Sequence, residues 1–330
     1  MFPFTTKQLK NEADLKMATT PGDHRKIAFI YGAVALGAGL ISLLVDFITG
    51  LMIENTGGLS DIGTRTILET VNYLFPLAVN ILLPLWMLGL MRTALQLARQ
   101  EKVTPRNLTQ GFPRWGVMLR LTLFQGITYF AIGYLTLQVS TILFSMTPLS
   151  ANVSELLLPY MEDPALLETA MADSAVMLSL VKAMLPVLIL WVVLMIAIMI
   201  PVAYGMRLSF YRILDDDRPG ALLSIGQSRK MMKGNKLALF KLDLSFWWYY
   251  LLQILLAVLL ELPIYLAGSV LPISADVLTL IAAVLQAAGG LWLYYKYLMK
   301  IEVCYALFYD TLYESHKTPP AQPQFFNWQQ

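Results

Sequence analysis

The sequence predicts an all-α membrane protein that crosses the bilayer six times, with both termini on the cytoplasmic side. Of its 330 residues, 57% are hydrophobic and only 14% are charged, whereas soluble domains carry about 25% charged residues. Six stretches without Asp, Glu, Lys or Arg reach or approach the ~20 residues that a membrane helix needs. The basic residues gather in alternate connections between these stretches.

The six stretches, once their ends are adjusted to neighbouring turns and polar residues, define three segments of the chain. Residues 1–26 form a cytoplasmic segment, residues 27–310 form the membrane domain, and residues 311–330 form a cytoplasmic tail. No connection is long enough for a separate soluble domain. The spans are expected at about 27–49, 70–91, 118–146, 180–206, 244–270 and 277–300.

Each of the first three spans has its own local signals. The first follows Arg25-Lys26, and its small residues, among them Gly37, favour close helix packing. The second contains Pro76 and Pro84, which can kink a helix because proline donates no backbone hydrogen bond. The third ends at Thr147-Pro148, which predicts a turn.

The last three spans also carry helix-breaking residues. The fourth contains Pro186 and Pro201, and the sixth contains Gly289-Gly290. The fifth is short as a charge-free stretch, so it is extended past Glu261. Broken helices can expose backbone carbonyls to a bound solute, although membrane helices tolerate these residues widely.

The distribution of positive charge predicts the orientation. Of the 24 basic residues, 22 lie before the first span, between Arg92 and Arg120, between Arg207 and Lys241, or from Lys296 onward. The other two, Arg65 and Lys182, lie in or beside the first and third connections, among acidic residues. Cytoplasmic connections of membrane proteins carry an excess of Lys and Arg. Both termini and the two basic connections are therefore expected on the cytoplasmic side.

The connection between the fourth and fifth spans predicts a basic helix in the membrane interface. Asp217 is placed to cap it and Gly234 to end it. An interfacial helix presses apolar residues into the bilayer and cations against anionic headgroups. Ordinary positive charge on a connecting helix is the alternative. The residues at helical spacing are Leu222, Ile225, Arg229 and Met232, and the candidate headgroup contacts are Arg229, Lys230, Lys233 and Lys236.

Neutral polar residues lie within the spans, and Asn80, Gln125 and Gln286 are the candidates for a solute path. Hydrogen bonds between helices are the alternative role for such side chains. No ionisable side chain is expected at mid-membrane, where ion-driven pumps usually carry carboxylates or histidines. The sequence therefore argues against such a pump and leaves a channel or passive pathway open.

The sequence predicts no catalytic, metal or cofactor site. Its one cysteine, Cys304, and two histidines, His24 and His316, are too few for a zinc site of thiolates and imidazoles, and these histidines lie outside the apolar stretches. No motif of a zinc peptidase or of a serine hydrolase is present. The net charge of +2 is too small to indicate nucleic-acid binding. We therefore expect a protein that is not an enzyme.

Three motifs resemble those of one bacterial membrane family. Ser228-Arg-Lys-Met-Met-Lys-Gly-Asn-Lys with the following Leu237 to Phe246-Trp247, Gln110-Gly111-Phe112, and Cys304 to Tyr309 resemble recurrent pieces of the family called domain of unknown function nine-seven-five. The family is also distantly similar to the membrane domain of some glycerophosphodiester phosphodiesterases. Membership implies six membrane helices and no established activity. The aromatic run Trp247 to Tyr250 departs from the family's lighter pattern.

The preferred functional prediction is a non-enzymatic module of the bacterial plasma membrane. Its cytoplasmic face would engage anionic lipid or a partner protein, because two basic connectors gather there and no catalytic residues are evident. The expected partners are membrane lipids, with a protein partner or a second copy as alternatives and no nucleic acid. The alternative function is a permease or exporter component for a small or amphipathic solute.

Overall fold

The computed structural model describes the greater part of the chain, and every regular element in that part is a helix. The apolar stretches of the sequence form the long helices, as expected, since a helix satisfies its own backbone hydrogen bonds in lipid. The described residues are 2–55, 62–151, 153, 174–216, 220–268 and 275–316.

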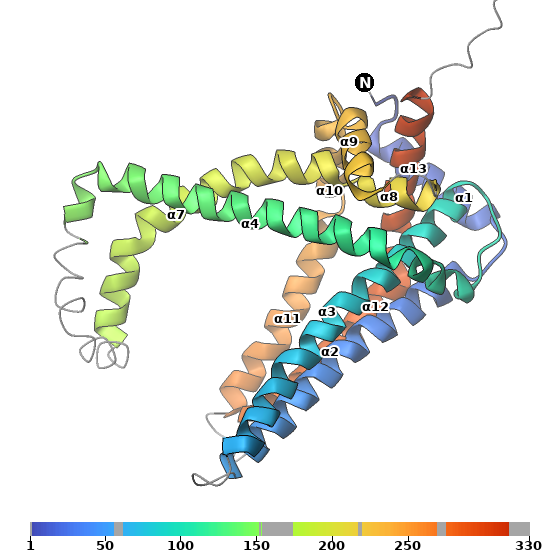
Figure 1. Cartoon of the computed structure of the whole chain (residues 1–330). Coiled ribbons are helices and arrows are strands. Elements are labelled where there is room, and N and C mark those ends of the chain that lie inside the picture. Colours follow the sequence, from blue (N-terminus) through green and yellow to red (C-terminus); the bar gives the residue numbers. More distant parts are fainter. Residues whose placement is uncertain are drawn as a thin grey trace, which may run out of the picture. The chain divides into compact units, whose positions relative to one another are not determined.

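The helices follow one another along the chain in the order that the colours of Figure 1 give. Two of them are not α-helices: η2 is a 3-10 helix and η3 is a π-helix. They are α1 Thr6–Thr19, α2 His24–Asn55, α3 Ile62–Ala98, η2 Pro105–Arg114, α4 Trp115–Ser145, α7 Ser174–Met206, α8 Ser209–Asp215, α9 Ala221–Met231, α10 Lys236–Leu244, α11 Trp247–Gly268, α12 Ala275–Leu293, η3 Tyr294–Leu298 and α13 Met299–His316.

Among the described residues, five continuous helical stretches are long and apolar enough to cross a membrane. A sixth is formed if α10 and α11, which meet at a bend of 46°, count as one span. The prediction of a six-helix membrane protein agrees with the upper count. The helices extend beyond the predicted spans: α3 has 37 residues and measures about 55 Å at ~1.5 Å per residue, against a hydrocarbon core of ~30 Å.

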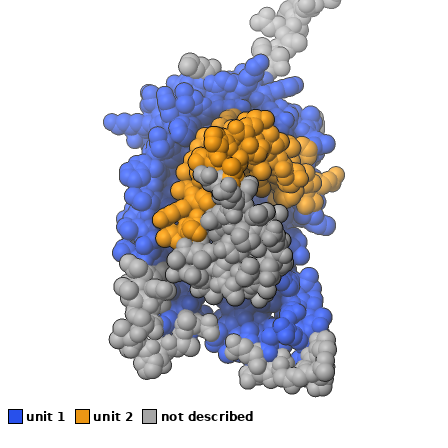
Figure 2. All heavy atoms as spheres, turned by 90° about the vertical axis from the view of Figure 1, so that its left-hand side faces the viewer, with its two compact units in different colours: residues 1–119, 208–330 blue, residues 120–207 orange. Residues whose placement is uncertain are grey.

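The chain divides into two compact units, which Figure 2 distinguishes by colour. One unit comprises residues 1–119 and 208–330, and the other comprises residues 120–207. The smaller unit contains parts of α4 and α7. There the indole Nε1 of Trp191 donates to the carbonyl of Gly133 at 3.1 Å, so a polar contact joins the two helices.

In the larger unit, α2 contacts both α3 and α12, and α11 contacts α12 (Figure 1). These long helices expose large apolar side chains over much of their length, including Ile48, Leu74 and Leu259. Such surfaces face lipid in a membrane protein, because water would make them costly to leave uncovered.

A packed core joins the ends of these helices with the shorter elements. Leu88 and Leu97 of α3 and Phe308 of α13 are fully buried there, together with Tyr211 of α8. The core therefore forms around the final turns of α3 and most of α13, where the hydroxyl of Tyr211 also donates a hydrogen bond to the carboxylate of Glu302. This packing positions the basic connection that the sequence singles out.

Backbone contact between η2 and α3 depends on two glycines. A Cβ placed on Gly89 would overlap the carbonyl of Leu108, and one on Gly111 would lie 2.6 Å from the carbonyl oxygen of Leu85. Only glycine permits so close an approach. The Gln110-Gly111-Phe112 motif thus has a structural explanation.

Candidate functional site

The basic connection folds into two short helices, α9 and α10. The N-cap of α9 is Gly220, which has no side chain to cap the helix. Asp217, the predicted cap, lies outside the described residues. The helix ends at Met231, and Gly234 follows in the turn with φ +81°, a conformation that glycine adopts readily. The predicted helix is therefore present and its end lies three residues before Gly234.

The predicted lipid-facing stripe of α9 is split between two environments. Leu222 is 66% exposed, whereas Ile225 is 3% exposed and Met232 is fully buried. The buried side packs on the protein because Ser228 Oγ accepts a hydrogen bond from the backbone N–H of Leu208 at 3.2 Å. The prediction of one continuous stripe is thus wrong: of the apolar residues at helical spacing only Leu222 is exposed, beside its exposed neighbour Leu223.

The four candidate cations lie around the turn between α9 and α10. Arg229, Lys230 and Lys233 are exposed and Lys236 is half-buried. All four belong to a segment of eight residues, so their charges act on a common region of space. The structure therefore keeps the predicted cations together, although their apolar neighbours differ from those expected.

The outward side of α10 supplies these apolar neighbours. Leu237, Phe240 and Leu244 recur at helical spacing and are all exposed, and Trp247 follows them. An exposed apolar stripe beside several lysines is the composition of a helix that lies in a membrane interface. The sequence did not predict this stripe, because the expected interfacial helix ends at Gly234 and the expected fifth span begins at residue 244, so Leu237 and Phe240 fall between the two.

The inward side of α10 is fixed by α1 and α13. Leu239 and Leu242 are buried. The Nζ of Lys10 donates to the carbonyl of Ser245 at 2.8 Å and lies 4.1 Å from the ring centroid of Phe246. The hydroxyl of Tyr305 also donates to the carboxylate of Asp243. The orientation of α10 is thus set by contacts from two helices distant in sequence.

An ion-pair network lies in the same core. The two terminal nitrogens of Arg99 each lie 2.6 Å from a carboxylate oxygen, one of Asp215 and one of Asp310. The hydroxyl of Tyr309 donates to Asp215 at 3.0 Å. Burial acts to lower the pKa of Arg99, but the hydrogen bonds to Asp310 and Asp215 outweigh it and raise the pKa, so this guanidinium stays charged. The network joins α3, α8 and α13.

The carboxylates of the Asp215 to Asp217 run are engaged by arginines where they are described. Asp215 pairs with Arg99, and Asp216 pairs with Arg212 at 3.1 Å. In the part of the chain that the structure describes, no three His, Cys, Asp or Glu side chains are grouped as metal ligands. Sequence analysis did not find Arg99 as a partner, because 116 residues separate it from Asp215.

The three predicted intramembrane residues are divided between the two compact units. Asn80 is exposed on α3 and Gln286 is half-buried on α12. Gln125 is buried in the smaller unit, where its Nε2 lies 3.5 Å from the carbonyl of Met206. A solute path along these residues remains a prediction from the sequence.

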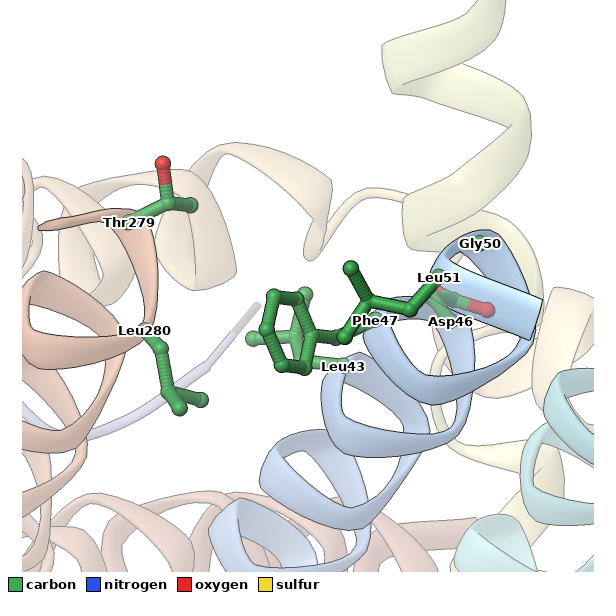
Figure 3. Close-up of a pocket in the computed structure, with 7 residues that line it drawn as sticks. All are labelled: Leu43, Asp46, Phe47, Gly50, Leu51, Thr279 and Leu280. Carbon is green, nitrogen blue, oxygen red and sulfur yellow. The ribbon is translucent and has the colours of Figure 1, made fainter. Parts of the chain in front are cut away.

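A pocket of about 300 Å³ lies between α2 and α12, and none of these three residues lines it. Figure 3 shows Leu43 and Phe47 of α2 reaching toward α12, while the carboxylate of Asp46 lies on the side of α2 away from Thr279. The pocket is therefore bounded mainly by apolar side chains. Its lining is Leu43, Asp46, Phe47, Gly50, Leu51, Thr279 and Leu280.

Comparison with known proteins places this arrangement in one family. The model of the family described as "Protein of unknown function (DUF975)" matches residues 35–316. No curated protein and no solved structure matches the chain, so the similarity to phosphodiesterase membrane domains stays a prediction. The match covers each motif quoted above and the long helices apart from the start of α2. The chain belongs to the family described as "Protein of unknown function (DUF975)".

Proposed function

We propose that this multi-pass membrane protein is a non-enzymatic module that binds anionic lipid through the turn between α9 and α10. The observation that carries the proposal is the pairing of exposed cations with exposed apolar residues in one short segment. Arg229, Lys230 and Lys233 supply accessible charge, while Leu237 and Phe240 supply apolar contact. A partner protein with an acidic surface is the alternative occupant.

The two parts of this surface act on different parts of a lipid. Each cation near an anionic membrane surface contributes about 1 kcal/mol, so four together favour anionic lipid by several kcal/mol. The apolar stripe on α10 gains about 25 cal/mol for each Å² removed from water. The charges thus supply selectivity for headgroups, and the stripe holds the segment at the bilayer surface.

The proposed location is the cytoplasmic leaflet of the bacterial plasma membrane. It is supported by the uneven distribution of the basic residues, because 22 of the 24 fall in the terminal segments and in the regions of the second and fourth connections. The positive-inside rule places such regions in the cytoplasm. In this orientation both termini and the α9–α10 turn lie in the cytoplasm, where anionic lipids create a negative surface potential.

The test is lipid retention by the purified full chain in native mass spectrometry. We expect R229Q/K230Q/K233Q/K236Q to lower the bound fraction of phosphatidylglycerol at least about fivefold, the loss that corresponds to about 1 kcal/mol. The charge-matched control K7Q/K26Q/K102Q/R106Q removes four exposed cations elsewhere in the chain and is expected to retain the lipid. Equal losses in the two variants would show that only net charge matters.

A further inference from the structure

A second cationic group, independent of the α9–α10 turn, lies where α12 meets α13. The Nζ of Lys296 lies 4.9 Å from the ring centroid of Trp292 and 5.2 Å from that of Tyr297. Trp248 of α11 meets Tyr297 edge to face at 4.7 Å between centroids. Four side chains from two long helical stretches thus form one cluster, which we call the Lys296 cluster.

A π-helix places two of these side chains over Trp292. Tyr294–Leu298 is the π-helical segment η3, between two α-helices. A π turn is bonded from residue i to residue i+5, so residues five apart lie nearly above one another. Tyr297 is therefore brought over Trp292 together with Lys296, with 6.2 Å between the two ring centroids. Such turns are rare and frequently mark functional sites.

The cluster lies at the passage from exposed apolar surface to buried core. Before it, Ile281 and Val284 of α12 are exposed, as is Trp292 itself at 55%. After it, Val303 and Phe308 of α13 are fully buried. Tryptophan, tyrosine and lysine at such a passage occupy the level of the lipid headgroups, because their rings are apolar and their polar ends need water or phosphate.

Polar groups at the cluster are available to a ligand. Within the described residues, Lys296 makes no ion pair, and neither the indole nitrogens of Trp248 and Trp292 nor the hydroxyl of Tyr297 makes a hydrogen bond. All four are hydrogen-bond donors, and an ammonium beside several N–H and O–H donors suits a phosphate. The acyl chains of the same molecule would contact the exposed apolar side chains of α11 and α12.

We infer that the Lys296 cluster binds a glycerophospholipid by its phosphate. Lys296 Nζ holds the phosphate oxygens, the indole and phenol groups of Trp248, Trp292 and Tyr297 donate further hydrogen bonds, and the rings pack on the glycerol. The inference goes beyond the proposed function, because it requires a phosphate and not a net negative charge. Zwitterionic phosphatidylethanolamine is therefore a ligand here, whereas the α9–α10 turn selects anionic lipid.

The inference is tested with the full chain in native mass spectrometry, using phosphatidylethanolamine, and diacylglycerol with the same acyl chains. We expect more phosphatidylethanolamine than diacylglycerol to stay bound. Lys296→Gln should lower the bound fraction of phosphatidylethanolamine at least about fivefold, because Gln cannot form the charge-assisted hydrogen bond that the lysine Nζ makes with the phosphate. Lys296→Arg and the control Lys102→Gln, at another exposed lysine, should retain it.

Two further variants keep the result interpretable. Tyr297→Phe preserves the ring and removes the hydroxyl, so it should weaken binding even if Lys296→Gln proves unstable. R229Q/K230Q/K233Q/K236Q should keep parental binding of phosphatidylethanolamine whether or not it loses phosphatidylglycerol, which separates this inference from the proposed function. Equal binding of diacylglycerol, displacement of the lipid by equimolar inorganic phosphate, or parental binding in both Lys296→Gln and Tyr297→Phe would overturn it.

Discussion

Gly89 and Gly111 lie where the backbones of α3 and η2 touch. Neither glycine has a positive φ in this structure, so space and not backbone conformation accounts for both. The Cβ of any other residue at position 89 would overlap the carbonyl of Leu108. The glycines therefore determine how closely η2 packs on α3, and hence the position at which α4 begins.

Substitution at Gly89 tests this contact. We expect Gly89→Ala to destabilise the protein by about 1–3 kcal/mol, the usual cost of an overpacked contact, and to lower the thermal unfolding midpoint in detergent. Gly37→Ala is the matched control on another long helix, because a Cβ there meets no atom within 4 Å. Equal midpoints for the two variants would contradict the role assigned to Gly89.

At the scale of elements, α8 is short and is held by side chains from three neighbours. Arg99, directly after α3, and Tyr309 of α13 bind its Asp215, and Arg114 of η2 donates to the carbonyl of Ile213. A helix of seven residues has little stability of its own. Its position thus depends on these contacts.

Removing Arg99 should disturb several elements at once. We expect Arg99→Met to destabilise the protein by about 1–3 kcal/mol, because two largely buried carboxylates lose their cation. Arg65→Met removes an exposed ion pair with Glu69 within one helix and should cost at most about 0.5 kcal/mol. Denaturant unfolding of both variants, followed by circular dichroism, measures the difference. A loss of similar size at Arg65 would count against the network.

The sequence predicts the long helices well and their contacts poorly. Charge-free stretches identify spans because lipid excludes charges from the middle of a helix. The same criterion ends the second span before Arg92, although α3 continues to Ala98, since tertiary contacts sustain its last turns. Arg99 and Asp310 are separated by 211 residues, and no local pattern records their pairing.

At the scale of the whole molecule, charge should determine the direction of insertion. Lys102 lies in a basic connection and Arg65 in an alternate one, and both side chains are exposed. Lys102 lies in the second connection and the four cations of the candidate site lie in the fourth, and both connections are predicted on the same side of the membrane. The position of those cations along the chain could thus be predicted from the sequence, whereas the outward stripe of α10 required the structure.

Cysteine labelling tests the orientation. Cys304 is buried, so Cys304→Ala provides a background for Arg65→Cys and Lys102→Cys. We expect a membrane-impermeant maleimide to label position 65 in intact bacterial cells and position 102 only after permeabilisation, as the positive-inside rule requires. The reverse pattern would place the α9–α10 turn outside the cell and remove the basis of the proposed function.

The core joins segments that leave the ribosome far apart in time. Phe2, before α1, stacks on Phe308 of α13 with 4.2 Å between ring centroids, and Lys300 of α13 pairs with Asp14 of α1. During synthesis α1 is therefore made long before α13. The side of α1 that contacts α13 stays uncovered while the intervening spans enter the bilayer. A nascent chain that stops before residue 299 would keep that side exposed to chaperones and proteases, so quality control can recognise incomplete copies.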